Sequence, residues 1–371
     1  MNNTVFNLNN VNKPTKTLFL PEEQGLSIQR YDDPLYPHIL KMLNIGFGLY
    51  WLPEEIKMDT DKINFPKLSE SEKHIVISNI KSQILLDSIM GRAPYMVFGP
   101  AINDPVFETL VCQWTYQEAI HSKSYTYIIQ NSFDDPEGVL STVMDAADIV
   151  ERSNTITEYY DDCIDKVAKY YNGECSKREA CEAIWLAIHG ANALESIRFP
   201  VSFACSFAFA EMGLLPGLGN VISLINRDES FHVAITNFLL KALPDDDPIF
   251  KEISEDKEII GKIRALWKKT YDEENKWADY LFVNGDAIGL NKNVVKKYLT
   301  YVATARLEAT KVGSTQEVLG VDPVTENPIA WVNKWLSNKD NQPAPQESEL
   351  TNYEKGVIDM SSGLGSLKFR G

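Results

Sequence analysis

Two short segments with one shared pattern decide the fold: Glu118-Ala119-Ile120-His121 and Glu229-Ser230-Phe231-His232. Positions i and i+3 of an α-helix lie about 60° apart, so the glutamate and the histidine of each segment can reach one ion from one helix face. The chain has only five histidines but 52 acidic residues. Two such pairs are therefore a mild excess over chance, and a pair of surface or capped ion pairs is the alternative explanation.

Two more carboxylates stand inside apolar runs. Asp87 lies within Ile84-Leu85-Leu86-Asp87-Ser88-Ile89-Met90, and Glu195 lies within Ala191-Asn192-Ala193-Leu194-Glu195-Ser196-Ile197. An ionised carboxylate rarely enters such a face unpaired, because burying an unpaired charge is strongly unfavourable. Binding to a metal would resolve both cases.

Along the chain, a helix with a single carboxylate is followed by a helix with a Glu-x-x-His pair, and this order then repeats. A four-helix bundle with a di-iron or di-manganese centre takes one carboxylate from each of two helices and a Glu-x-x-His pair from each of the other two. We therefore predict an all-α, ferritin-like helical bundle with a di-metal carboxylate centre in its core. Asp87, in place of the usual glutamate, is the one deviation. The predicted ligands are Asp87, Glu118, His121, Glu195, Glu229 and His232.

The donor set indicates the kind of metal. Oxygen and nitrogen ligands without a thiolate suit iron or manganese better than structural zinc. We expect two iron ions per chain, and manganese remains possible because such a site does not choose strongly between the two metals.

Helix boundaries can be read from capping signals and apolar periodicity. Ser69 and Ser176 each open a capping box, Asp104-Pro105 provides a cap with proline at the first helical position, and Pro244 should stop a helix. The predicted helices are 69–91, 104–131, 176–213, 221–243, 248 through 271, 292–311 and a short piece at 331–336.

Composition excludes several classes of protein. A formal charge of -16 and a pI near 4.8 argue against a nonspecific grip on nucleic acid or on an anionic membrane. No uncharged run reaches the length of a membrane span, and the Asn-rich start does not resemble a signal peptide. Five cysteines without a C-x-x-C pair indicate reduced thiols and a cytoplasmic protein.

The chain divides by character into three parts. Residues 1–30 read as an extended N-terminal segment and residues 31–337 as one helical domain. Residues 338–371 are rich in Asn, Gln, Pro, Ser and Gly, which is typical of a flexible tail.

One tyrosine should face the metals. Tyr125 is seven residues after Glu118 and four after His121, which places it within about 20° and 40° of them around the helix. A phenol enclosed in hydrocarbon beside a metal could lose one electron and survive as a radical. Four apolar residues at helical spacings from Glu195 and Glu229 would line its pocket, although they would also serve as ordinary core: Phe199, Phe203, Ile222 and Ile225.

Several segments together resemble the small (beta) subunit of aerobic class I ribonucleotide reductase, in which the aspartate ligand is the usual one. The resemblance spans nearly the whole chain from about Tyr31. The segments are Leu85-Leu86-Asp87-Ser88-Ile89, Glu118-Ala119-Ile120-His121-Ser122-Lys123-Ser124-Tyr125, Asn192-Ala193-Leu194-Glu195-Ser196-Ile197-Arg198-Phe199, Val201-Ser202-Phe203-Ala204-Cys205-Ser206-Phe207 and Arg227-Asp228-Glu229-Ser230-Phe231-His232.

The resemblance implies a mechanism. A reduced metal pair reacts with dioxygen, Tyr125 becomes the stored radical, and the oxidising equivalent passes to a cysteine of a large subunit that reduces ribonucleotides. By position, Trp51, Asp228 and His121 would be the inner end of the transfer path, and Tyr353 would carry the radical across the subunit boundary. The plainer alternatives are a core aromatic for Trp51 and a salt bridge for Asp228.

The resemblance also implies partners: a large (alpha) subunit bound by the C-terminal tail, and a second copy of this chain in a homodimer. The basic end of the tail departs from the acidic ends typical of bacterial relatives, which leaves open which large subunit it recognises. Its expected anchors are Leu364, Leu367 and Phe369. A ferritin-like oxidase or oxygenase of an organic substrate, and an iron-handling ferritin relative, are the competing functions.

Overall fold

The protein is described by a computed structural model that places residues 6–8, 17–21, 28–145, 147–287 and 289–336. Over these residues the chain is a helical bundle, and its β-structure is limited to two isolated bridges, Phe19 with Ile102 and Ala287 with Leu290. None of its described helices is long and apolar enough to cross a membrane. The all-α prediction is confirmed.

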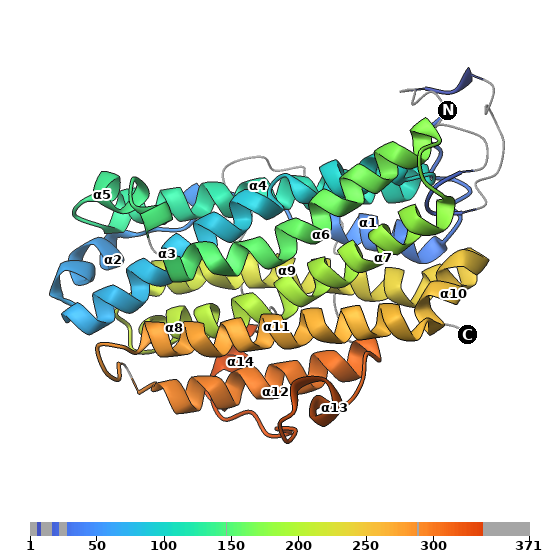
Figure 1. Cartoon of the computed structure of the whole chain (residues 1–371). Coiled ribbons are helices and arrows are strands. Elements are labelled where there is room, and N and C mark those ends of the chain that lie inside the picture. The colour runs from blue at the N-terminus through green and yellow to red at the C-terminus, as the bar shows by residue number, and fades with distance from the viewer. Residues whose placement is uncertain (1–5, 9–16, 22–27, 146, 288, 337–371) are drawn as a thin grey trace.

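Long helices run side by side along the molecule and make up most of it (Figure 1). The α-helices are α1 (Pro37–Phe47), α2 (Asp59–Asn64), α3 (Glu70–Met90), α4 (Pro105–Ser132), α5 (Pro136–Leu140), α6 (Ala147–Asn172), α7 (Lys177–Ala193), α8 (Phe199–Glu211), α9 (Pro216–Asp246), α10 (Pro248–Glu255), α11 (Lys257–Leu281), α12 (Lys292–Thr310), α13 (Thr315–Leu319) and α14 (Asn333–Leu336). There are two π-helical segments: η4 (Pro94–Phe98) lies between α3 and α4, and η7 (Leu194–Arg198) joins α7 directly to α8.

The predicted caps form as expected. The Ser69 and Ser176 hydroxyls accept hydrogen bonds from the backbone N–H groups of Glu72 and Glu179, and the Asp104 carboxylate accepts one from Phe107. These bonds satisfy N–H groups that the first turn of a helix leaves unpaired. They begin α3, α7 and α4 at the predicted residues.

Several boundaries differ from the prediction. Helix α9 begins at Pro216, five residues before the predicted start at 221. The single helix expected over 176–213 is divided by η7 into α7 and α8. Pro244 does not stop α9, which runs on to Asp246, so the missing N–H of this proline is tolerated two residues before the helix ends. The helix expected from 248 through 271 is two, because the Asp256 carboxylate accepts from the N–H groups of Glu258 and Ile259 and so begins α11 anew.

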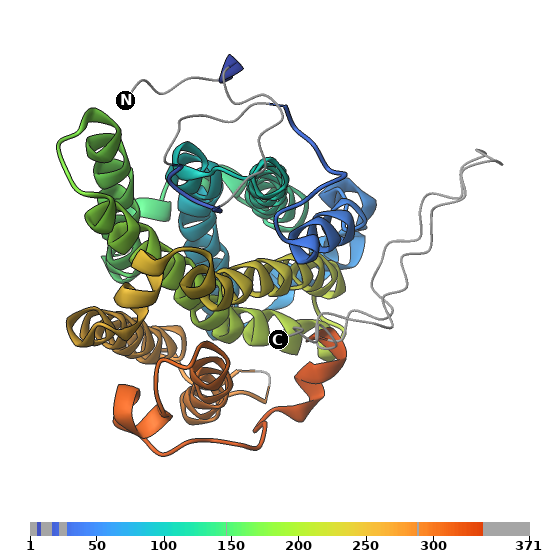
Figure 2. The same cartoon turned by 90° about the vertical axis from the view of Figure 1, so that its right-hand side faces the viewer.

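Four elements surround the centre of the bundle. Helix α4 packs against α3 and α9, while η7 packs against α9, α11 and α12. Viewed at right angles to Figure 1, the orange and red C-terminal helices form an outer layer beside this centre (Figure 2). The positions predicted to bind metal lie on α3, α4, η7 and α9, that is, on the inner elements.

Candidate metal centre

The structure buries all six predicted ligands in the middle of the bundle. α3 provides Asp87, α4 provides Glu118 and His121, η7 provides Glu195, and α9 provides Glu229 and His232. Each of these residues is at most 3% exposed. Side chains that are far apart along the chain, such as those of Glu118 and His232, therefore meet away from water.

The six side chains form two overlapping groups. In one, ligand atoms of Asp87, Glu118, His121 and Glu229 lie within 4.8 Å of one another. In the other, those of Glu118, Glu195, Glu229 and His232 do the same. Glu118 and Glu229 belong to both groups, and two carboxylates shared in this way are suited to bridging two ions. The arrangement thus has two halves, which we call the Asp87 half and the Glu195 half.

Atoms without a hydrogen-bonding partner converge on the same space. Among the described residues, neither carboxylate oxygen of Asp87, Glu195 or Glu229 has a hydrogen-bond donor. Burial, followed by repulsion from neighbouring carboxylates, raises the pKa of Asp87 and of Glu195 well above the usual range. Buried polar groups are normally paired, so this concentration of unpaired oxygens fits cations that would satisfy them.

Both histidines turn the same nitrogen toward the carboxylates. His121 Nδ1 lies 3.4 Å from Glu118 Oε2 and 3.2 Å from Glu229 Oε1. His232 Nδ1 lies 3.1 Å from Glu118 Oε1 and 3.4 Å from Glu229 Oε2. The two Nδ1 atoms are therefore the ones available to a metal, and the donor set of carboxylates and imidazoles suits iron or manganese.

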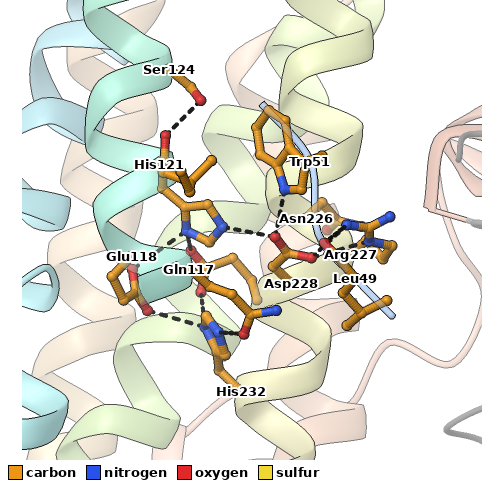
Figure 3. Close-up of polar contacts among 12 residues, drawn as sticks. Leu49, Trp51, Gln117, Glu118, His121, Ser124, Asn226, Arg227, Asp228 and His232 are labelled. Atoms are coloured by element: carbon orange, nitrogen blue, oxygen red, sulfur yellow. Dashed lines mark hydrogen bonds and ion pairs between the residues drawn. The ribbon is translucent and has the colours of Figure 1, made fainter. Parts of the chain in front are cut away.

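Partners behind the ligands fix the orientation of the rings (Figure 3). His121 Nε2 lies 3.3 Å from Asp228 Oδ2, and His232 Nε2 lies 3.0 Å from Gln117 Oε1. Each acceptor selects the tautomer with hydrogen on Nε2, which leaves Nδ1 free to bind metal. The indole of Trp114 donates to Glu118 Oε1 at 2.9 Å.

Sequence reasoning missed Gln117 and Trp114. Trp114 stands four residues before Glu118, a spacing that puts the two on one helix face and could have identified it. Gln117 contacts a residue of another helix, so no local pattern points to it.

Asp228 forms a junction between His121, Trp51 and Arg227 (Figure 3). It accepts a 2.7 Å hydrogen bond from Trp51 Nε1 through Oδ2, the same oxygen that faces His121. Its Oδ1 accepts from Arg227, whose guanidinium also donates to the carbonyl of Leu49 at 2.7 Å. The structure thus contains both the predicted Trp51–Asp228–His121 chain and the alternative salt bridge, and Trp51 is also a core aromatic at 2% exposure.

Tyr125 is fully buried beside the Asp87 half. Burial, followed by the charges of Asp87 and Glu229, raises the pKa of its phenol well above the ordinary value. The four predicted pocket residues are each at most 1% exposed and belong to the same hydrophobic core as Tyr125: Phe199, Phe203, Ile222 and Ile225. The two phenylalanine rings stack 5.2 Å apart. Tyr353 and the tail anchors lie outside the described residues.

A family model and individual relatives of the chain point to the same protein family. The family model "Ribonucleotide reductase, small chain" matches residues 31–315. Subunit beta of ribonucleoside-diphosphate reductase 1 from Escherichia coli O157:H7 is 39% identical over 353 residues, covering 91% of each chain. Subunit beta of the enzyme from Enterobacteria phage T4 is 31% identical over 96% of each chain.

Solved structures share the fold at lower identity. The ribonucleotide reductase R2 subunit from Clostridium botulinum has a TM-score of 0.74 at 20% identity, covering 90% of this chain and 98% of that one. The dimanganese(II)-NrdF structure from Streptococcus sanguinis has a TM-score of 0.66 at 18% identity, covering 84% of this chain and 100% of that one. The family match and the curated relatives together show that the chain belongs to the ribonucleotide reductase small chains and is the beta subunit of that oxidoreductase.

Proposed function

We propose that this chain binds two metal ions through Asp87, Glu118, His121, Glu195, Glu229 and His232 and stores a radical on Tyr125. The observation that carries the proposal is the pair of overlapping ligand groups, in which Glu118 and Glu229 are shared. Iron is our first choice of metal. Manganese is the alternative, and the dimanganese(II) form of the Streptococcus sanguinis relative supports it.

The bound metals would supply, with dioxygen, the oxidising power that removes one electron from Tyr125. The protein's part is to keep that phenol protonated beforehand, which its raised pKa ensures, and to receive its proton when the electron leaves. Asp87, whose charge helps to raise the pKa of the phenol, would accept this proton. The surrounding hydrocarbon excludes water and reductants, so the phenoxyl radical would persist.

Trp51, Asp228 and His121 would carry the oxidising equivalent away from the centre. Asp228 Oδ2 touches both the indole N–H and the imidazole N–H, at 2.7 and 3.3 Å, so a proton can shift locally as an electron passes. Arg227 keeps Asp228 ionised: burial alone would raise the pKa of this carboxyl, but Arg227, His121 and Trp51 lower it below the usual value.

Membership in the family implies a large-subunit partner. We infer that the C-terminal tail binds it, that Tyr353 passes the radical to it, and that ribonucleoside diphosphates are reduced there. We also infer a homodimer, and a reducing, cytoplasmic setting in which the five cysteines stay free. An oxidase of an organic substrate would give Trp51 and Tyr353 no role, so it is the weaker proposal.

Metal analysis of ligand variants tests the proposed centre. Glu229→Ala removes a shared ligand and should weaken both halves, leaving fewer than one ion per chain. Asp87→Ala and Glu195→Ala each affect one half and should leave about one ion. Glu252→Ala, a change at a carboxylate whose side chain is 70% exposed, is the control and should retain two. Two tightly bound ions in Glu229→Ala would contradict the proposal.

A further inference from the structure

Four buried charges meet where the end of η7 contacts α6 and α11. They are Arg152 of α6, Arg198 at the end of η7, and Glu273 and Glu274 of α11, and each is at most 5% exposed. Two positive and two negative charges balance within the group. We call these four residues the ion quartet, and none of them is among the predicted ligands or the radical path.

The other three members of the quartet contact both the side chain and the backbone of Arg198, the last residue of η7. The Arg198 guanidinium contacts Glu273 through Nη2, and its Nη1 lies 3.6 Å from Glu274 Oε1. Arg152 donates to Glu274 Oε1 at 2.9 Å through Nε and to the carbonyl oxygen of Arg198 at 3.4 Å through Nη2. The last residue of η7 is therefore held by two neighbouring helices.

Neighbouring side chains make further polar and aromatic contacts with members of the quartet. Thr155 donates to Glu273 Oε1 at 2.7 Å, and Arg152 donates to the hydroxyl of Ser82 on α3. The Arg152 guanidinium lies 4.3 Å from the ring centroid of Trp277. Each of these partners belongs to a long helix, so the quartet connects the end of η7 to the long helices of the bundle.

Glu195 depends on η7 more than any other ligand depends on its own element. Glu118, His121 and His232 have hydrogen-bonding partners behind them. Asp87 and Glu229 have none, but each stands inside an uninterrupted α-helix. Glu195 has no hydrogen-bond partner among the described residues and also stands on a π-helical segment. Only the placement of η7 aims its carboxylate at the centre.

The position of η7 has a local cause. Pro200 has no N–H to give to the carbonyl of Ser196, and its ring crowds that carbonyl, so the regular helix cannot pass through this point unchanged. Single π-helical turns are rare, and they occur frequently at functional sites. In η7 the widened turn sends Glu195 toward His232 on α9, at 3.9 Å, and Arg198 toward α11.

We infer that the ion quartet positions Glu195 and thereby sets the metal affinity of the Glu195 half. Stability alone does not account for the quartet, because a buried ion pair replaced by apolar side chains of similar volume often leaves stability unchanged or improved. Residues behind a ligand commonly change metal affinity by about 10–100-fold when mutated. The four are positioning residues, and the inference rests on the metal centre proposed above.

The test is an anaerobic titration of the apoprotein with Mn(II) alone, in which the paramagnetic resonance signal of free Mn(II) reports binding. The double variant Arg198→Met/Glu273→Met removes both charges and keeps the volume. It should bind one ion as the wild type does and the other about 10–100-fold more weakly, as Glu195→Ala should. Arg198→Lys, which keeps the charge, should lie between the double variant and the wild type.

A control separates positioning from loss of stability. Ile263→Ala makes a cavity in the same helix as Glu273, ten residues or about 15 Å along it, and should still bind two ions with wild-type affinities. Double-variant protein that binds both ions as the wild type does would overturn the inference. Wild-type protein that binds no Mn(II) pair would instead overturn the metal centre itself, so the two failures are distinguishable.

Discussion

Asp228→Asn changes only one atom of the side chain but disturbs three partners. Four N–H donors converge on the two carboxylate oxygens, from Trp51, His121 and twice from Arg227. An amide offers one oxygen and one NH₂ group, so at least one donor must face another donor. The Arg227 guanidinium, only 5% exposed, also loses its counter-charge.

The size of the effect follows from that uncompensated charge. Removing one partner of a buried pair costs about 3–5 kcal/mol, and the bond from Arg227 to the Leu49 carbonyl keeps the expected loss near the lower end. An unfolding entropy of about 2.1 cal/mol/K per residue over 371 residues gives about 0.8 kcal/mol/K. The apoprotein should therefore melt roughly 4–5 °C lower.

Calorimetry of the apoprotein checks this value against a matched substitution. Asp272→Asn alters a carboxylate whose side chain is 48% exposed and which pairs with Lys268, and it should shift the melting temperature by less than about 1 °C. If the two variants melt within about 1 °C of each other, the Asp228 junction does not carry the buried charge balance described above.

Three further predictions concern separate parts of the chain. Burial lowers the pKa of His189 to about 3, so the unfolded chain takes up a proton below about pH 6.5 and the folded chain does not. Between pH 7 and pH 5 the wild type should therefore lose about 2 kcal/mol more unfolding free energy than His189→Phe. Equal losses in urea titrations of the two proteins would contradict this prediction. Pro200→Ala restores an N–H for the Ser196 carbonyl and should weaken Mn(II) binding in the Glu195 half, whereas unchanged affinities would separate Pro200 from the shape of η7. Tyr353→Phe should still bind the large subunit but lose nucleotide reduction, and full activity would place the radical path elsewhere.

The sequence predicted what depends on local pattern. Serine and aspartate caps such as Ser69 and Asp104 begin their helices through bonds to residues three positions on, so both ends of the interaction are visible in the chain. The burial and proximity of the six candidate ligands were predictable for a related reason. A carboxylate inside an apolar run, such as Asp87, is so costly that it indicates a compensating ion.

Interactions between distant segments were not predictable in this way. The Arg198 contact with Glu273 joins positions 75 residues apart, and that of His232 with Gln117 joins positions 115 apart. Pro244 is predicted to stop a helix, but α9 continues two residues past it, and no local pattern shows that a proline is tolerated there. The π-helical turn at Glu195 was missed because its cause, Pro200, also fits the first turn of an ordinary helix.

The central claim is that a metal centre held by these six residues oxidises Tyr125. The most direct measurement is an electron paramagnetic resonance spectrum of apoprotein loaded with Fe(II) without oxygen and then exposed to air. Wild-type protein should give a stable tyrosyl signal, and Tyr125→Phe, which keeps the ring volume, should bind the same iron and give none. An unchanged signal in Tyr125→Phe, or no signal in the iron-loaded wild type, would contradict the account.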